Sequence, residues 1–329
     1  MFINSDTSKE DMTSVQNKNK EESIPAAITD IGCEREINED RYAVVDSPLG
    51  QAWIVCDGMG GVLGGELAAQ LAIDAIRRAL ENGDYENSKE ALRTAVEEAN
   101  RIIVLRRQNP AFGSMGTTVV AVIINDEEVV ITHAGDSRAY LLTEGQVAHL
   151  TKDHTYVQEM VERGEITPEE AMDHPQSHVL VKCLGAEPRL GLDFKNLWLW
   201  PLAEGQKEDK IILCSDGLYS LVTDDEIAEI TTNFTPQEAC VKLVEMAKDR
   251  GGFDNITLSI LPLNGRLKDQ ELPVDSSLRK VKSKSRYYSP YAKDKEEKMP
   301  LGKRILLFSL FILLGAVVTS LFILITMMK

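Results

Sequence analysis

The chain has 329 residues and a formal net charge of −16, with 36 Lys and Arg against 52 Asp and Glu. The acid excess lies in residues 1–263, which hold 23 Lys and Arg and 46 Asp and Glu, and it argues against nucleic acid as a partner. The five cysteines have no metal-ligand spacing and an odd number, which indicates reduced thiols rather than a zinc site or a disulfide framework.

The sequence of residues 1–263 predicts a leader followed by one folded domain. Residues 1–22 are polar and charged and contain no apolar run, so we expect a disordered leader and no signal peptide. Residues 23–263 are within the size that one domain can reach. Early in this domain, Asn38-Glu39-Asp40 precedes an expected strand at 42–45, which places two carboxylates beside that strand.

Two short segments, 54–60 and 211–218, place an aspartate in the same sequence context. In each segment an apolar run ends at an aspartate, Asp57 or Asp216, and a glycine follows it directly. Such a run, closed by an Asp-Gly turn, predicts a buried strand whose tip carries a carboxylate. Glycine lets the backbone approach closely, so the Gly58 carbonyl can itself bind a ligand.

Apolar spacing along the domain alternates between helical and strand patterns. Helical spacing predicts helices over 66–80, 89–107, 157–161, 224–230 and 236–249, with a further helix start at Thr167-Pro168. Apolar runs predict strands over 117–124, 129–133, 138–142, 146–150, 211–215 and 256–261. Periodicity alone therefore indicates an α+β domain.

Five segments of this domain place a carboxylate at the edge of an expected strand. The acids are Glu39 with Asp40, Asp57, Asp136, Asp216 and Asp254. Taken alone, each one is better explained by a turn, because Asp before Gly or Asn commonly forms one. Acids that converge would repel one another and raise each other's pKa, unless divalent cations lie between them. Carboxylates without His or Cys suit Mg²⁺ or Mn²⁺ rather than zinc, and they point to metal-assisted hydrolysis.

The motifs that carry these acids follow one another in a recognisable order. They are Arg35 with Asn38-Glu39-Asp40, Asp57-Gly58-Met59-Gly60-Gly61, Gly116-Thr117-Thr118, Gly135-Asp136-Ser137-Arg138, Ser215-Asp216-Gly217 and Asp254-Asn255. This order resembles the metal-dependent protein Ser/Thr phosphatases of the PP2C family over about residues 25–263. The Asp-Gly-Met-Gly-Gly form and the stretch 150–169 are similar to the bacterial members.

The resemblance implies two main metal ions, Mn²⁺ or Mg²⁺, and a ligand set for each. Asp57 would bridge both ions, and the carbonyl of Gly58 would bind one of them. Asp216 and Asp254 would bind the first ion, and Glu39 would bind the second.

The remaining motif residues have implied supporting roles. Asp40 would orient waters on the second ion, and Asp136 would belong to a third, weaker metal site shared with Asp216. Arg35 would hold the substrate phosphate, since its planar fork matches phosphate bidentately. Asn255, which follows Asp254, would support the ligand shell.

The resemblance also implies a fold and a reaction. The fold would be a four-layer α-β-β-α sandwich of two antiparallel sheets with helix pairs outside. A hydroxide bridging the two metals would hydrolyse phosphoserine and phosphothreonine on proteins, a Ser/Thr kinase among them, and the enzyme is expected to be a monomer. One alternative is a phosphatase that acts on a single partner protein. The other is an inactive fold that binds phosphoproteins or scaffolds a membrane complex. Retention of every metal acid and of Arg35 counts against that alternative.

One departure concerns the general acid. Members of the family often carry a His just after the Asp-Gly motif, whereas Met59 and Val62 occupy those positions here and cannot donate a proton. The five histidines are His133, His149, His154, His174 and His178, and none of them is assigned a catalytic role. The segment 152–185 resembles a flap beside the active site, with an ordinary helical insertion as the alternative.

The last part of the chain predicts a membrane anchor. Residues 264–304 form a basic stretch that is expected to be a disordered linker, and 305–328 are 24 residues without charge. Such a run is long enough to span a bilayer of about 30 Å, so we expect one C-terminal transmembrane helix. The basic flank at 279–304 favours a single-pass protein with its catalytic domain in the cytoplasm. Because the domain is acidic, we expect an anionic membrane surface to repel it.

Overall fold

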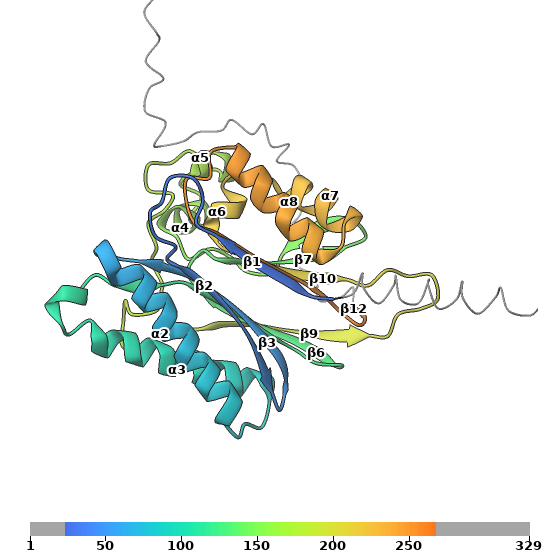
Figure 1. Cartoon of the computed structure of the whole chain (residues 1–329), viewed down its shortest axis with the longest axis horizontal. Helices are drawn as coiled ribbons and strands as arrows, with labels where there is room; N and C mark the ends of the chain where they lie inside the picture. The colour runs from blue at the N-terminus through green and yellow to red at the C-terminus, as the bar shows by residue number, and fades with distance from the viewer. Residues whose placement is uncertain (1–23, 268–329) are drawn as a thin grey trace, which may run out of the picture. The chain divides into compact units, whose positions relative to one another are not determined.

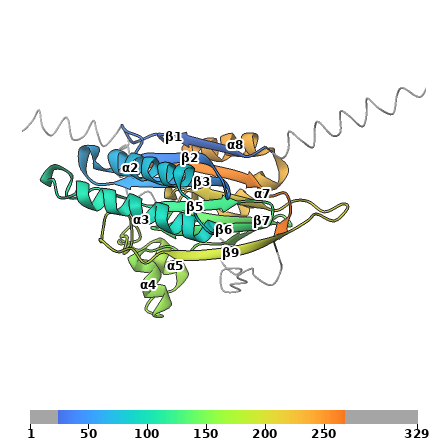
Figure 2. The same cartoon turned by 90° about the horizontal axis from the view of Figure 1, so that it is seen from below.

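Two antiparallel β-sheets stack face to face in the computed structural model, which describes residues 24–267 (Figures 1 and 2). The predicted leader at 1–22, almost all of the predicted linker and the predicted transmembrane helix at 305–328 lie outside the described residues. Within residues 24–267, no helix is long and apolar enough to cross a membrane.

The first sheet has five strands and the second has seven. The first runs in the order β1 (Ala26–Asp30), β11 (Ile256–Pro262), β10 (Lys210–Cys214), β7 (Arg138–Thr143) and β8 (Gln146–His149). The second runs β12 (Arg266–Leu267), β9 (Asp193–Trp200), β6 (Glu128–Ala134), β5 (Val119–Ile124), β3 (Gly50–Met59) and β2 (Asp40–Ser47). The short strand β4 (Gly116–Thr117) pairs with the end of β3.

Helices cover the outer face of each sheet (Figure 1). The pair α2 (Gly61–Asn82) and α3 (Ser88–Arg106) packs on the second sheet. The helices α6 (Asp216–Tyr219), α7 (Asp224–Asn233) and α8 (Pro236–Asp249) pack on the first. Between β8 and β9, the chain forms α4 (Tyr156–Glu162) and α5 (Pro168–Met172), and a short 3-10 turn, η1 (Pro110–Phe112), follows α3.

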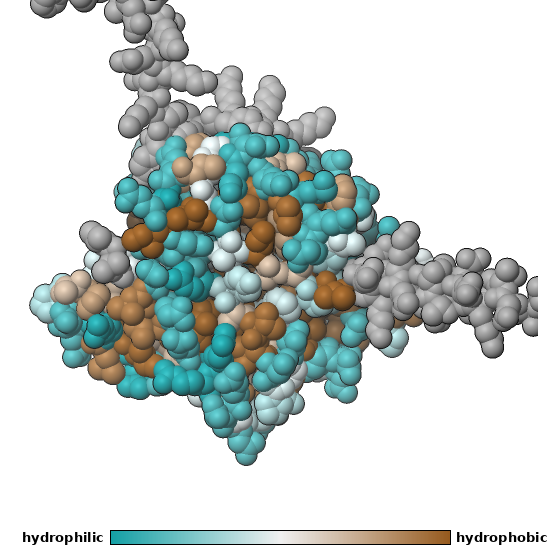
Figure 3. Space-filling view, in the orientation of Figure 1, coloured by the Kyte–Doolittle hydropathy of each residue, from teal (hydrophilic) through white to brown (hydrophobic). Residues whose placement is uncertain are grey.

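Three apolar cores hold the four layers together. One lies between the sheets and includes Trp53, Val55 and Leu213, while the other two lie between a sheet and its helices. Because both faces of the central strands are covered, β3 is buried without interruption from Ala52 to Cys56. The face seen in Figure 3 is largely polar, with apolar residues in separate patches. The predicted α+β sandwich of two antiparallel sheets with helices is confirmed.

The predicted elements match the structure most closely where caps mark their ends. Helix α8 has the predicted bounds, and Thr235 and Glu238 form a capping box at its start. Helix α2 begins at Gly61, before the predicted start at 66, because glycines in its first turns carry no side chain that could show periodicity. Strand β9 was not predicted, because its sequence DFKNLWLW mixes charged and apolar residues without clean alternation.

The folded domain continues past residue 263. Strand β12 pairs with β9, so that Arg266 lies opposite Trp200 and Leu267 opposite Leu199. The side chain of Leu267 is buried in the core between the sheets. The first residues of the expected linker therefore belong to the second sheet.

Candidate active site

Six carboxylates converge where the strands of both sheets end. Glu39 and Asp40 come from the start of β2, Asp57 from β3, Asp136 from the β6–β7 turn, Asp216 from the start of α6, and Asp254 from the loop before β11. The pKa of Asp57 is raised well above its ordinary value, first by burial and then by the charges of Asp40, Asp216, Asp136 and Asp254. The pKa of Glu39 is raised by burial, and the charge of Asp254 adds to the shift. The structure thus brings together the acids that the sequence predicted to converge.

Asp57 and Gly58 do not form the predicted turn. Strand β3 continues through both residues and pairs with β4, so that Gly58 lies opposite Thr117. A Cβ atom on Gly58 would collide with the carbonyl of Gly65 and come within 2.8 Å of the carbonyl oxygen of Glu39. Glycine is required because β3, α2 and the chain before β2 approach one another closely at this point. This packing sets Asp57 beside the other acids.

Thr118 holds the backbone of Asp57 in place. The Asp57 N–H donates to Thr118 Oγ1 over 2.9 Å, and the Thr118 N–H donates to the Asp57 carbonyl over 2.8 Å. The hydroxyls of Thr118 and Ser137 are also hydrogen-bonded at 2.6 Å. These bonds interrupt the predicted strand 117–124 between β4 and β5. They also connect Asp57 with the residue that follows Asp136.

Asp40 is buried, and only one of its carboxyl oxygens has a hydrogen-bond partner. The Ser215 hydroxyl donates to Asp40 Oδ2 over 2.7 Å, while Oδ1 has no partner among the described residues. Burial raises the pKa of Asp40 to about 8, and the charges of Asp216 and Asp254 act in the same direction. A buried acceptor without a donor is costly, so Asp40 Oδ1 is suited to a bound water or cation.

Asp216 opens α6 rather than a turn, with Ser215 at the N-cap. Burial raises the pKa of Asp216 to about 6, and the charge of Asp254 adds to the shift. Its Oδ1 is a second buried oxygen without a partner in the described part of the chain. Burial followed by the charge of Asp216 likewise raises the pKa of Asp136 well above its ordinary value.

Arg35 lies at the edge of the acid cluster with part of its side chain in solvent. Its Nη2 donates to Asp254 Oδ2 over 2.7 Å, and its Nη1 lies 3.7 Å from Glu39 Oε2. The side chain is 45% exposed, so the guanidinium is within reach of an incoming anion. The structure therefore sets the predicted phosphate-binding arginine next to two predicted metal acids.

Asn255 ties the loop that carries Arg35 to β11. Its Oδ1 accepts from the Glu39 N–H over 2.7 Å, and its Nδ2 donates to the carbonyls of Ile31 and Ile37 over 2.9 and 3.1 Å. The side chain is buried, and all three bonds cross from one end of the domain sequence to the other. This geometry agrees with the predicted supporting role of Asn255.

Two of the histidines lie near the Asp136 turn and are held there by hydrogen bonds. His133 and His154 stack with ring centroids 4.4 Å apart. His154 Nδ1 accepts from the Gly135 N–H, and its Nε2 pairs with Asp193 Oδ2 over 2.8 Å. Burial lowers the pKa of His154 to about 4, so the ring is neutral at pH 7 and bound at both nitrogens. It is not placed as a replacement for the missing general acid.

The donor chemistry of the cluster suits hard divalent cations, although its side chains as they stand do not form a complete ligand set. Among residues 24–267, no three His, Cys, Asp or Glu side chains are grouped so that they could hold a metal ion. Mg²⁺ and similar ions keep several waters and need only one or two carboxylates each. The two unpartnered oxygens, on Asp40 and Asp216, and the raised pKa values in an all-oxygen cluster fit such ions.

Comparison with known proteins gives the family of the chain. The family model described as protein phosphatase 2C matches residues 34–248. The chain belongs to the protein phosphatase 2C family. It is 36% identical over 240 residues to the serine/threonine phosphatase Stp of Listeria monocytogenes, which covers 71% of this chain and 93% of that protein. The enzyme is accordingly a serine/threonine protein phosphatase.

Solved structures of this phosphatase family share the fold. The serine/threonine phosphatase of S. agalactiae has a TM-score of 0.67 at 30% identity, covering 72% of this chain and 98% of that one. The catalytic domain of the phosphatase PstP, solved with two manganese ions, has a TM-score of 0.62 at 32% identity, covering 73% of this chain and 98% of that one.

Two supporting residues of the phosphatase had no predicted role. Ser215 binds Asp40, and Thr118 binds the backbone of Asp57. Both lie inside motifs that the sequence already singled out, and this position could have marked them as candidate site residues. A hydroxyl in a motif shows no partner until the strands are paired, which is why neither role could be predicted.

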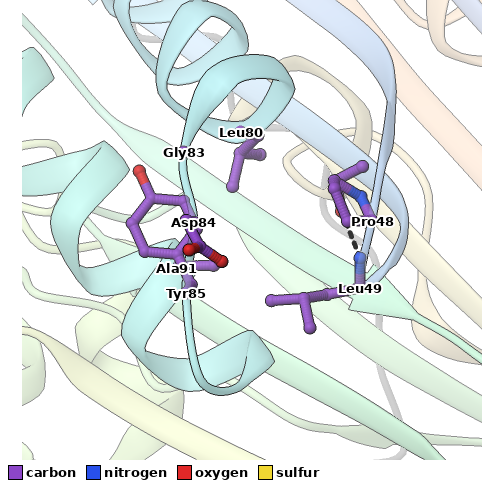
Figure 4. Close-up of a pocket in the computed structure, with 8 residues that line it drawn as sticks. Pro48, Leu49, Leu80, Gly83, Asp84, Tyr85 and Ala91 are labelled. Carbon is purple, nitrogen blue, oxygen red and sulfur yellow. Dashed lines mark hydrogen bonds between the residues drawn. The ribbon is translucent and has the colours of Figure 1, made fainter.

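A small cavity of the phosphatase lies away from these acids (Figure 4). It has a volume of about 50 Å³ and lies between the β2–β3 turn, at Pro48 and Leu49, and the α2–α3 loop, at Tyr85. None of the six carboxylates lines it. Its position gives it no part in phosphate chemistry.

Proposed function

We propose that this phosphatase uses Mn²⁺ or Mg²⁺ held by the carboxylate cluster to hydrolyse phosphoserine and phosphothreonine on proteins. The observation that supports this most is the cluster itself, in which buried acids with raised pKa values leave two oxygens unpartnered. Acids in this state are stabilised by cations, and phosphate hydrolysis requires positive charge at the same place. The PstP structure with two manganese ions supports the choice of metal.

In this proposal each acid has a defined place in metal binding. Asp57 would contribute to both sites and the Gly58 carbonyl to one of them, while Asp216 and Asp254 would contribute to the first site and Glu39 to the second. Asp40 orients waters through its free oxygen, and Asp136 with Asp216 forms a weaker third site. When bound, the ions lower the pKa of water and offset charge on the phosphoryl oxygens.

The chain's own residues hold and orient the substrate. Arg35 offers its exposed guanidinium to the phosphate, and Asp254 fixes one side of that group over 2.7 Å. Asn255 keeps the Arg35 loop at a constant distance from β11 through its three hydrogen bonds. Ser215 donates to Asp40 Oδ2, and the second oxygen, Oδ1, has no partner within residues 24–267.

The test is metal-dependent turnover by the full chain. We expect release of p-nitrophenol from p-nitrophenyl phosphate and of phosphate from phosphoserine and phosphothreonine peptides, in each case only with Mn²⁺ or Mg²⁺ present. The matched control is Asp57→Asn protein at the same metal concentration. Binding of phosphopeptides without turnover under these conditions would favour the inactive binding fold instead.

We further propose that the phosphatase is a monomer tethered to the cytoplasmic face of a membrane by 305–328 and that it opposes a Ser/Thr kinase. The uncharged run and the basic flank at 279–304 support the tether and its direction. A reporter that works only outside the cytoplasm, fused to the N-terminus, should give no signal. A strong signal there would contradict the orientation.

Phosphoproteomics of a deletion strain would identify the substrates and the kinase.

A further inference from the structure

Two tryptophans expose their rings at one edge of the domain. Trp198 and Trp200 are 41% and 56% exposed, whereas Trp53, the third tryptophan of the chain, is 7% exposed in the core between the sheets. The pair lies two residues apart on β9, so both side chains leave the same face of the strand. Leu202, 40% exposed, follows them. A gathering of large exposed apolar side chains commonly marks an interaction surface.

The described chain ends beside this edge. Arg266 and Leu267 of β12 lie opposite Trp200 and Leu199, as Figure 1 shows for the two strands. From there, residues 268–304 lead to the uncharged run at 305–328. A membrane tether at 305–328 would therefore be joined to the domain at this edge.

We propose that Trp198, Trp200 and Leu202 form a bilayer-docking face, which enters the headgroup region of the membrane that holds the tether. This proposal rests on the proposed membrane tether. Tryptophan suits that region because its ring is apolar and its N–H remains able to reach polar groups. A tether raises the effective concentration of the face at the bilayer, so that even a weak contact is occupied.

The docking face and the active site lie at opposite ends of strand β6. Trp198 lies opposite Glu128 at the start of β6, whereas the carboxylate Asp136 follows the other end of that strand. The seven residues of β6 separate the two ends by about 20 Å. Docking at this face would therefore leave the acid cluster about 20 Å along the strand from the point of membrane contact, where it stays open to phosphorylated residues.

Charge does not assist this contact. Asp126 and Glu127 lie in the turn next to β9, where the Leu199 N–H donates to the Glu127 carbonyl over 2.8 Å. The docking is therefore apolar, and it should persist in zwitterionic lipid and at high salt. Electrostatic attraction of the basic stretch at 279–304 acts separately and is weakened by salt.

Tryptophan fluorescence of the full chain in phosphatidylcholine vesicles tests the proposal directly. Residues 268–329 contain no tryptophan and Trp53 is buried, so quenching by lipids brominated near the headgroup reports Trp198 and Trp200 alone. We expect quenching in the wild type at low and high salt, and weaker quenching in Leu202→Ser, which keeps both reporting tryptophans. The Trp198→Ser/Trp200→Ser variant gives the background signal of Trp53. The matched control is Phe234→Ser, which removes an exposed aromatic ring at the end of α7 and should leave quenching unchanged.

Separate readouts distinguish the ways in which the proposal can fail. Flotation of the chain with vesicles, without tryptophan quenching, would overturn the docking face and leave the tether standing. A chain that does not float would overturn both. A dimer in detergent that the double variant converts to a monomer would assign this face to a second copy of the chain and overturn bilayer docking. Unchanged turnover of p-nitrophenyl phosphate confirms that the double variant is folded.

Discussion

Asp40 and Asp57 are direct cross-strand partners in the β2–β3 pair, so a buried carboxylate faces a half-buried one on the neighbouring strand. Like charges directly opposite one another in a sheet are destabilising. The arrangement is stable only if protons or cations remove the repulsion. A position that weakens the fold and serves metal binding is typical of a functional site.

The first prediction concerns Asp57→Asn. We expect its turnover with Mn²⁺ to fall by more than roughly 100-fold, since even residues that only support metal ligands typically cost about 10–100-fold. In EDTA, the same variant should be at least as thermostable as the wild type, because one of two opposed charges is gone. Kinetics and thermal melts measure both effects.

The matched control is Asp46→Asn at the other end of the same strand pair. Asp46 lies opposite Gln51 and accepts from its Nε2 over 3.0 Å, away from the acid cluster. We expect unchanged turnover. Near wild-type turnover in folded Asp57→Asn protein, with metal still bound by calorimetry, would contradict the role of Asp57.

The second prediction concerns pH. Asp40 and Asp216 have pKa values of about 8 and about 6 in the folded protein, against an ordinary value of 3.8. Between the ordinary pKa of 3.8 and the raised pKa of each group, the folded state holds a proton that the unfolded state has released. The stability of the metal-free protein therefore falls as pH rises from about 4 to about 8. In EDTA, Tm should therefore be higher at pH 6 than at pH 8 by at least about 2–4 °C, which is the shift that 1 kcal/mol gives in a domain of this size.

Added Mn²⁺ should reverse that trend. Metal binding needs ionised carboxylates, so the rise in Tm on adding Mn²⁺ should be larger at pH 8 than at pH 6. Asp40→Asn is the control, because it removes one of the titrating groups and should flatten the metal-free profile. A metal-free Tm that rises from pH 6 to pH 8 would contradict the proposed protonation of the cluster.

The third prediction concerns Arg35. Arg35→Ala should raise KM for a phosphopeptide by roughly 10–100-fold, which corresponds to the loss of one or two hydrogen bonds to a charged group. The change in kcat should be smaller, because the lost interaction already exists in the bound substrate. Arg35→Lys should restore only part of the affinity, since the bidentate fork is gone.

Arg101→Ala provides the comparison for Arg35. Arg101 makes an exposed ion pair with Glu98 on α3, at 2.6 Å, and takes no part in the acid cluster. Its removal should leave both kinetic constants unchanged. An unchanged KM in Arg35→Ala protein would remove Arg35 from phosphate binding.

The fourth prediction concerns Asn255. Asn255→Ala removes the acceptor of the Glu39 N–H and the donor to two carbonyls of the loop before β2, at a cost of about 1–3 kcal/mol in the free energy of unfolding. Because the Arg35 loop then loses its hydrogen bonds to Asn255, kcat/KM should fall by at least about tenfold. Urea unfolding and steady-state kinetics give the two values.

The control for Asn255 is Asn233→Ala, whose amide donates only to a carbonyl within its own helix, over 2.8 Å. It should change kcat/KM little. If Asn255→Ala loses stability but keeps wild-type kcat/KM, the residue is structural and does not position the site.

Most helices and strands, and the residue types gathered at the site, could be predicted from local sequence. Local signals were sufficient for helix α8, whose cap, Pro and apolar spacing stand within one stretch of chain. The acid motifs also named residues that the structure brings together, and their residue types restrict the metal whatever the fold. The same signals were insufficient for β9, whose strand conformation depends on pairing with β6 and β12.

Which groups meet depends on how the two sheets pack. Asp57-Gly58 extends a strand instead of turning because β4 pairs with it, and that pairing joins residues far apart in sequence. The partner of Asp40 is the hydroxyl of Ser215, 175 positions along the chain, and no local pattern could identify it. Such hydrogen bonds arise only when the two sheets pack, and so does the burial that raises the pKa values of the acids. Neither can be deduced from the segment around Asp40 or the segment around Ser215 alone.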